Sequence, residues 1–332
     1  MAISVFNQSL LLLGGITVFL LGLMSISENM NDLTGERTRK LLSKCSSSAV
    51  RGVFTGTVVT ALAQSSIAIN VVVIGFTESG LLSLYSACGI VMGANVGTTI
   101  TAQIISLSGI SAFDITALGS LVAFSGMIMK VTVKNKATKA IGSVMIGFGL
   151  IFIGIEIMSE SVEFFKEFEW FKRIFLIDNP FVLFLNGIVL TAIMQSSSAV
   201  TSSMVVLAVG GLLSFKNSVF LILGANIGTC FPVILSSLKK SETARRVAMF
   251  NLIFNAFGAV LFFIPMLFFG DEISALFTST VSIGRAIANF HTVFNLIVTL
   301  ITLPMLKIFV KMVSRIVIDG KNLKKNKTFK YI

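Results

Sequence analysis

Long apolar stretches separated by short polar segments dominate the chain, and they predict helices that span a membrane. The clearest stretches have almost no charge and are long enough to cross a bilayer as helices, which takes about 20 residues. They are residues 9–25, 113–129, 140–155, 247–269 and 287–306. Glu28, rather than a small-residue cleavage site, follows the first stretch, so we expect a retained helix that ends near Asn29.

A polar phrase occurs twice in this apolar background. Thr60-Ala-Leu-Ala-Gln64-Ser65-Ser66 returns 131 residues later as Thr191-Ala-Ile-Met-Gln195-Ser196-Ser197-Ser198. Gly93-Ala-Asn-Val-Gly-Thr98 returns at the same offset as Gly224-Ala-Asn-Ile-Gly-Thr229. A repeat whose most similar parts are polar, within apolar sequence, indicates a paired site inside a membrane.

The basic residues gather in four clusters, and these clusters predict the topology. They fall within residues 37–51, 130–139, 239–246 and 307–332. Basic loops usually face the cytoplasm. All four reach that side only if residues 51–76 form a re-entrant hairpin rather than a full crossing. Residues 180–209 then form a second hairpin that enters from the opposite face. We therefore expect the N-terminus outside and the C-terminus in the cytoplasm.

The predicted fold is an all-α polytopic membrane protein with an inverted-topology repeat. It has two re-entrant helical hairpins, two discontinuous transmembrane helices and about seven full crossings of the cell membrane. The discontinuous helices are residues 81–107, broken near 95–98, and residues 214–238, broken near 226–229. We expect the whole chain, 1–332, to be one membrane transport domain. Its parts are repeat one (about 9–130), repeat two (about 140–269), an extra last helix (about 283–310) and a basic cytoplasmic tail (311–332).

Composition supports this class and narrows the partners. Of the 332 residues 55% are hydrophobic and 12% are charged, about half the charged share of soluble domains. The net charge of +11 sits in loops and in the tail, which favours the cytoplasmic-loop bias over a nucleic-acid partner. The three scattered cysteines predict neither a disulfide framework nor a metal site.

The duplicated phrases have the chemistry of a site for an anion beside cations. A helix that begins at the membrane midplane presents free N–H groups and the positive end of its dipole. Serine hydroxyls add donors, and amide, hydroxyl and carbonyl oxygens suit a hard cation such as Na⁺. The predicted anion ligands are Ser65, Ser66, Ser196 and Ser197. The predicted cation ligands are Gln64, Asn95, Thr98, Gln195, Ser198, Asn226 and Thr229, with Thr60, Thr191, Asn255, His291 and Asn295 as supporting residues.

Other interpretations of these residues stay open. Small residues and serines also pack membrane helices together, which would make the protein a scaffold that transports nothing. His291, the only histidine, raises an intramembrane serine hydrolase as an alternative. One base cannot serve two symmetric serine groups, so we expect no enzyme, and we expect His291 to be buried and hydrogen-bonded. Arg285 is expected to anchor the outer end of a helix.

Six sequence motifs resemble those of a known family. They are Thr60-Ala-Leu-Ala-Gln-Ser-Ser66, Gly93-Ala-Asn-Val-Gly-Thr-Thr99, Thr191-Ala-Ile-Met-Gln-Ser-Ser-Ser-Ala199, Gly224-Ala-Asn-Ile-Gly-Thr229, Ala244-Arg-Arg-Val-Ala-Met-Phe-Asn-Leu-Ile-Phe-Asn255 and Ile287-Ala-Asn-Phe-His-Thr-Val-Phe-Asn295. With them the chain resembles the type II sodium–phosphate cotransporter family, in its bacterial branch. The resemblance implies inorganic phosphate as substrate, Na⁺ as the coupling ion, no organic cofactor, and the two Gln-Ser-Ser regions as the shared site.

Two features depart from the family pattern. Ile67 stands where the family typically carries a third serine, so one potential ligand is lost from the first half. The chain also ends at Ile332 without the PhoU-like domain of some bacterial relatives, so we expect any such regulator to be a separate protein.

The predicted function is sodium-coupled transport of inorganic phosphate by alternating access. Its partners are phosphate, sodium ions and the lipid bilayer, and a homo-oligomer is compatible with the sequence. Alternatives are a sodium symporter or exporter for another oxyanion or a carboxylate, a passive channel, and a non-transporting scaffold.

Overall fold

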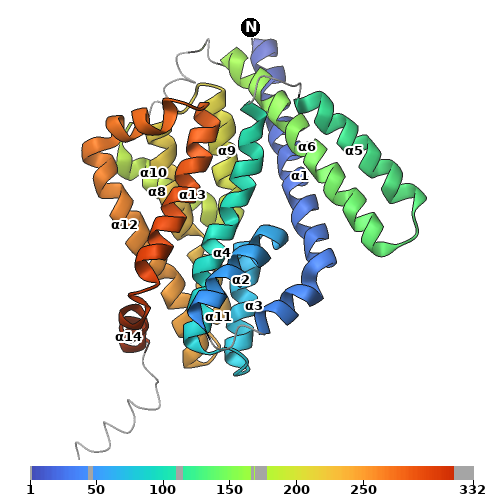
Figure 1. The fold of residues 1–332 in the computed structure, drawn as a ribbon. Coiled ribbons are helices and arrows are strands. Elements are labelled where there is room, and N and C mark those ends of the chain that lie inside the picture. Colours follow the sequence, from blue (N-terminus) through green and yellow to red (C-terminus); the bar gives the residue numbers. More distant parts are fainter. Residues whose placement is uncertain (1, 44–47, 110–114, 166–167, 169–177, 318–332) are drawn as a thin grey trace, which may run out of the picture.

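The computed structural model describes residues 2–43, 48–109, 115–165, 168 and 178–317 of the chain. Within these residues every regular element is a helix, which confirms the all-α prediction (Figure 1). The helices are α1 (Ala2–Ser43), α2 (Ala49–Ala63), α3 (Ser66–Glu78), α4 (Leu84–Ile105), η1 (Ser106–Gly109), α5 (Ile115–Thr132), α6 (Lys136–Phe165), α8 (Pro180–Met194), α9 (Ser197–Val209), α10 (Phe215–Gly228), α11 (Cys230–Ser237), α12 (Glu242–Thr278), α13 (Ile283–Thr302) and α14 (Leu306–Ile316).

Six apolar segments are long enough to cross a bilayer, so the protein is a multi-pass membrane protein. They are Ser4–Ile26, Leu84–Ile105, Lys136–Phe165, Phe215–Ser237, Glu242–Thr278 and Ile283–Thr302. These six match six of the seven predicted crossings. The seventh, at 113–129, corresponds to the shorter apolar helix Thr116–Thr132, and its first residues lie outside the described part of the chain.

Only one of the two predicted helix breaks is present. The prediction of a break near residues 95–98 is wrong, because α4 continues through Asn95 and Thr98. Their side chains donate to carbonyl oxygens of the same helix, Asn95 to Val91 at 2.9 Å and Thr98 to Ala94 at 2.9 Å. In the second repeat α10 does end at Gly228 and α11 begins at Cys230. Pro232 explains this break, because it has no N–H to donate to the carbonyl of Gly228.

Two helix ends also differ from prediction. The first helix does not end near Asn29, because α1 continues to Ser43. The last helix does not reach residue 310: α13 ends at Thr302, two residues before Pro304, which cannot continue a helix. A separate helix, α14, follows and includes residues 311–316 of the predicted tail, while residues 318–332 lie outside the described part.

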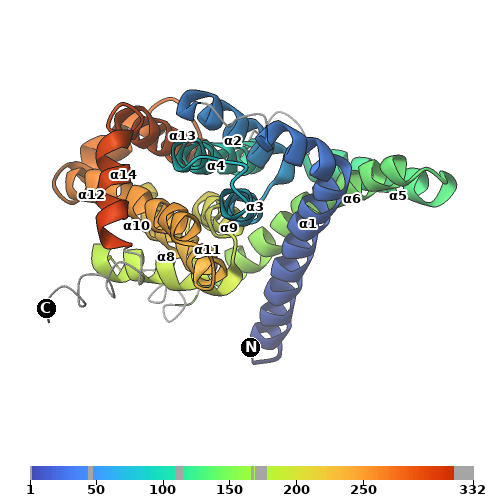
Figure 2. The ribbon, with the colours of Figure 1, turned by 90° about the horizontal axis from the view of Figure 1, so that it is seen from below.

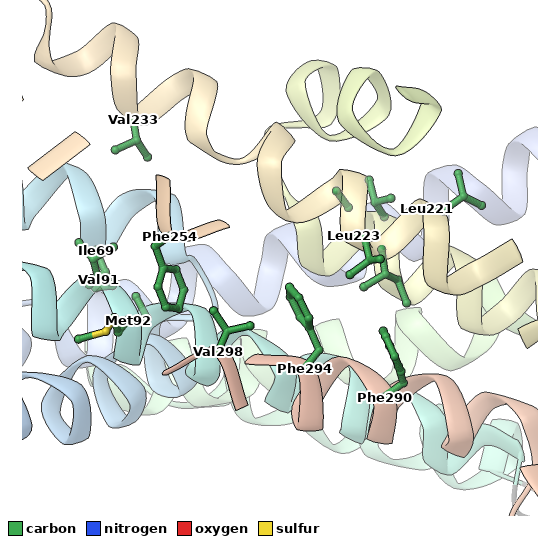
Figure 3. Packing of buried hydrophobic residues seen from close by; sticks show 14 of the residues in the cluster. Ile69, Val91, Met92, Leu221, Leu223, Val233, Phe254, Phe290, Phe294 and Val298 are labelled. Atoms are coloured by element: carbon green, nitrogen blue, oxygen red, sulfur yellow. The ribbon is translucent and has the colours of Figure 1, made fainter. Parts of the chain in front are cut away.

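The helices form two groups with α4 and α9 between them. Figures 1 and 2 show α1, α5 and α6 on one side of the molecule and α10, α12, α13 and α14 on the other. On the second side, Phe290, Phe294 and Val298 of α13 point toward Leu223 of α10 and Phe254 of α12 (Figure 3). Phe294 also packs edge-on against Phe262 of α12, with ring centroids 5.1 Å apart. This aromatic packing fixes α13 against the helices that carry the second repeat.

Candidate functional site

The two Gln-Ser-Ser phrases fold into the same tight turn. Gln64 ends α2 and Gln195 ends α8, and both adopt left-handed backbone conformations with φ of 56° and 52°. Among the described residues other than glycine, these two alone have positive φ. The next residue, Ser65 or Ser196, is extended and is the N-cap of the following helix. A non-glycine residue costs about 1–2 kcal/mol in the left-handed region, so the turn is strained at both copies.

Each turn leaves helix N–H groups unused within its own helix. The Ser65 hydroxyl accepts from the N–H of Ala68, and the Ser196 hydroxyl accepts from the N–H of Ala199, both at 3.2 Å. The first two N–H groups of α3 and of α9 have no acceptor within the helix. These groups and the positive ends of the two helix dipoles are suited to an anion.

The turns face each other across a small cavity. In Figure 1 α2 and α3 lie in the lower half of the molecule, and α8 and α9 lie in the upper half. Residues 64–67 and 195–198 together line a space of about 10 Å³, roughly the room of one water. All four predicted anion-binding serines line this space, as does Ile67.

A larger cavity adjoins the small one. It has a volume of about 470 Å³ and shares with it Gln64, Ser65, Gln195, Ser196 and Ser198. No lysine or arginine lines either cavity among the described residues. An anion here must therefore be bound by hydroxyls, N–H groups, helix dipoles and bound cations.

The two glutamines differ in their side-chain contacts. The amide of Gln64 is engaged on both ends: Nε2 donates to the carbonyl of Ala61 at 2.5 Å, and Oε1 accepts from the Thr101 hydroxyl at 2.6 Å. Gln195 is exposed and lines both cavities, and no side-chain hydrogen bond of its amide is found in the described part of the chain. Of these two predicted cation ligands, Gln195 is therefore the one whose amide oxygen has no partner in the described structure.

The remaining predicted cation ligands line neither cavity. Asn226 donates to the Ile222 carbonyl at 2.9 Å, as Asn95 does to Val91 in the first repeat. Thr229 donates to the Asn226 carbonyl at 2.6 Å, three residues back, whereas Thr98 bonds four residues back to Ala94. Thr60 and Thr191 are fully buried, and their hydroxyls have no partner among the described residues. These residues occupy equivalent positions in the two repeats, which is why the sequence paired them.

The supporting residues on α12 and α13 are buried in the helix core. Asn255 donates to the Asn251 carbonyl at 2.8 Å, and Asn295 donates to the His291 carbonyl at 2.9 Å. His291 is buried as predicted, but the expected hydrogen bonds are absent, because neither ring nitrogen has a partner in the described structure. The His291 side chain is therefore held by the packing of the surrounding helices and not by a hydrogen-bond acceptor.

One polar contact at the site was not predicted from the sequence: Thr101 holds the Gln64 amide. Farther along α4, Arg285 donates to the Gln103 carbonyl at 3.4 Å and to the Ser106 hydroxyl at 3.2 Å, and so caps the end of that helix. Arg285 therefore has the helix-end role expected of it, but on a neighbouring helix. A comparison of the repeats could have identified Thr101, because Pro232 stands at its equivalent position.

Comparisons with known proteins agree with the repeat motifs. The sequence model of the family described as Na⁺/Pi-cotransporter matches residues 18–160 and 169–300. A Salmonella typhimurium protein whose name assigns it to inorganic phosphate export, YjbB, is 28% identical over 317 residues, which is 94% of this chain and 56% of the relative. The uncharacterized YqeW of Bacillus subtilis is 24% identical over 307 residues, and the match spans 96% of YqeW.

More distant relatives share only part of the chain. Human sodium-dependent phosphate transport protein 2B is 35% identical over 103 residues, which is 30% of this chain and 15% of that protein. The chain spans about half the length of the YjbB proteins that it matches (56%). No solved structure matches it significantly.

Proposed function

Because the chain belongs to the Na⁺/Pi-cotransporter family, we propose that it carries inorganic phosphate across the cell membrane, coupled to sodium ions, by alternating access. The observation that supports this most is the pair of identical strained turns facing one cavity. Phosphate binds at the two turns, held by Ser65, Ser66, Ser196 and Ser197 and by the free N–H groups of α3 and α9. Because the space between the turns has room for about one water, the ion extends into the adjoining 470 Å³ cavity. Non-helical backbone at membrane depth is tolerated where it lines such a cavity.

Sodium binds beside the phosphate in this proposal. Its ligands are the oxygens of Gln195 and Ser198 at the cavity, with Gln64, Asn95, Thr98, Asn226 and Thr229 completing the coordination in other conformations of the cycle. Without a basic side chain in the cavity lining, bound Na⁺ also offsets the charge of the phosphate. This is the physical reason for coupling: each ion lowers the cost of burying the other.

The proposed topology has α2–α3 and α8–α9 as re-entrant hairpins from opposite faces. Three polar contacts between distant segments support it, because each joins segments assigned to one face. Glu78 accepts from the N–H of Ser241 at 2.6 Å, and Arg246 donates to the carbonyls of Ser314 and Val317, all on the cytoplasmic side. Lys216 pairs with Asp271 at 3.1 Å on the outer side. Labelling of single cysteines at Lys240 and Asp271 from opposite sides of a sealed cell tests this, and labelling of both from one side contradicts it.

Uptake by proteoliposomes tests the function. We expect labelled phosphate to accumulate when an inward Na⁺ gradient is imposed and to stop accumulating when K⁺ replaces Na⁺. Sulfate or dicarboxylates that displace phosphate completely would indicate another substrate, and uptake independent of Na⁺ would contradict the coupling.

Export is the second candidate direction, because the YjbB relatives are named for it. Coupling to a gradient is reversible, so an outward Na⁺ gradient should drive phosphate out of the same vesicles. Phosphate that equilibrates without ever moving uphill would indicate a passive channel.

A further inference from the structure

The 470 Å³ cavity is much larger than inorganic phosphate requires. Phosphate has five heavy atoms and occupies roughly the space of two to three waters, about 60–90 Å³. The cavity also falls in the range of sites for small organic molecules, about 300–1,000 Å³. Most of its volume therefore lies beyond the two turns.

The two ends of this cavity differ in chemistry. Gln64, Ser65, Gln195, Ser196 and Ser198 form the polar end. The remaining wall is largely apolar and comes from α1, α4 and α6. It includes Leu20, Leu23, Met24, Ile104, Phe148 and Ile151. Such a wall cannot bind the oxygens of an anion, but it can bury an alkyl group, with a gain roughly proportional to the area removed from water.

We propose that the site takes monoalkyl phosphates, with the phosphate head between the turns and the alkyl chain along α1 and α6. A monoester keeps three free oxygens for the serine hydroxyls and N–H groups, and it replaces the fourth oxygen contact with an ester-linked chain. The chain then extends into the apolar part of the cavity, past Leu23 and Phe148. This inference rests on the proposed phosphate site and extends its ligand class from inorganic phosphate to amphipathic phosphate monoesters.

Competition with phosphate uptake tests this ligand class. Methyl, butyl, hexyl and octyl phosphate are added to proteoliposomes that take up labelled phosphate. We expect the half-inhibitory concentration to fall roughly fourfold for each methylene buried, until the cavity is filled. Longer chains also partition into the bilayer, so potency alone does not locate the binding site.

Matched variants separate the cavity from the bilayer. Leu23→Gln places a polar group in the apolar wall, whereas Leu21→Gln changes the same residue type on the same helix at a side chain that is 51% exposed. Val144→Thr is a nearly isosteric second variant of the wall, which guards against a folding defect in Leu23→Gln. We expect both wall variants to weaken the dependence on chain length at least tenfold between methyl and octyl phosphate, with the KM for phosphate unchanged. Leu21 lies in the span Ser4–Ile26, so Leu21→Gln controls for a polar side chain in the membrane outside the cavity, and its dependence on chain length should match that of the unmodified protein.

The outcomes distinguish this inference from the proposed function. Potency that does not depend on chain length, or that depends on it equally in all variants, overturns the inference and leaves phosphate transport intact. Absence of phosphate uptake with and without a Na⁺ gradient overturns the proposed function and, with it, this inference.

Discussion

The two glutamines that end α2 and α8 place backbone strain at the centre of the molecule. Gln64 and Gln195 adopt left-handed φ although a glycine would do so without cost. A strained residue retained at both copies of a repeat indicates that its side chain matters, since strain of this kind concentrates at functional sites. Both glutamines were predicted from the sequence as site residues, but their left-handed backbone conformation was not.

Gln195 allows its amide and its backbone to be tested separately. Gln195→Ala keeps the strain and removes the amide, whereas Gln195→Gly removes both. We expect both variants to lose most Na⁺-dependent uptake, and we expect Gln195→Gly to be more stable than Gln195→Ala by about 1 kcal/mol. Uptake assays and denaturant unfolding in detergent measure the two effects. Full uptake by the glycine variant would show that the backbone turn alone is sufficient.

Thr101 makes the two halves unequal. Its hydroxyl holds the Gln64 amide oxygen at 2.6 Å, and the equivalent position in the second half is Pro232, which cannot donate. The same residue difference breaks the second helix and leaves Gln195 without that partner. This asymmetry lies at a position that differs between the repeats, so the matching positions did not predict it.

Removal of the Thr101 hydroxyl should loosen the first turn. Thr101→Val leaves Oε1 of Gln64 without its donor. The cost is below the ~1–3 kcal/mol of a fully buried group, because Gln64 is half-buried and lines the cavity. We expect a raised KM for phosphate and a lowered unfolding temperature, with Thr101→Ser restoring both. Kinetics of Thr101→Val that match those of the unmodified protein would refute a positioning role for this hydroxyl.

At the scale of elements, α3 is tied to the start of α12 through Glu78. The hydroxyl and the backbone N–H of Ser241 hold the pKa of the Glu78 carboxyl below its usual range, and Lys240 adds to the effect. A carboxyl with a lowered folded-state pKa stabilises the fold above its unfolded pKa of about 4.3 and loses that contribution as pH falls through the folded value.

The lowered pKa of Glu78 gives a pH-dependent prediction. Glu78→Gln should unfold at a lower temperature than the unmodified protein at pH 7. The difference should shrink as pH falls below the unfolded pKa of about 4.3 and vanish below the lowered folded-state pKa, where the carboxyl is neutral in both states. Glu272→Gln, at an exposed glutamate of α12, serves as the control. A difference that persists unchanged at low pH would show that the ionised carboxylate is not the cause.

The paired helices pack so closely that glycine is required where they cross. A Cβ on Gly93 would overlap the carbonyl oxygen of Val53, and a Cβ on Gly224 would overlap that of Phe184. These positions are equivalent in the two repeats, so α2 packs on α4 as α8 packs on α10. The sequence contained both glycines, but the partner carbonyls could only be identified in the folded structure.

Gly224→Ala tests this close approach. We expect it to destabilise the fold by about 1–3 kcal/mol, because the atoms that the Cβ meets are backbone atoms of α8, which cannot turn aside as a side chain can. Gly75→Ala on α3 is the matched control, because nothing lies within 4 Å of the added Cβ, and alanine should stabilise that helix by about 0.5–1 kcal/mol. Thermal unfolding of both variants gives the comparison. Equal effects at the two sites would contradict the account of the crossing.

At the scale of the whole molecule, hydropathy predicted more than local motifs did, and the topology predicted from charge stays a prediction. Six spans and the all-helical class followed from apolar length, and the two turns followed from the repeat. The helix breaks were predicted less well, because asparagine and threonine bond to their own helix as readily as they interrupt it. Proline, at 232 and at 304, was the better signal. The large cavity could not be predicted, because its wall combines residues from α1, α4 and α6 that are far apart in the sequence.

The central claim is that the two duplicated turns together hold one phosphate ion. The most direct test is a cryo-EM map of the protein in lipid with saturating phosphate and Na⁺. We predict tetrahedral density between Ser65-Ser66 and Ser196-Ser197, within hydrogen-bond distance of both turns. Density for the anion elsewhere, for example at the Gln103 and Arg285 end of α4, with no ion between the turns, would contradict the account.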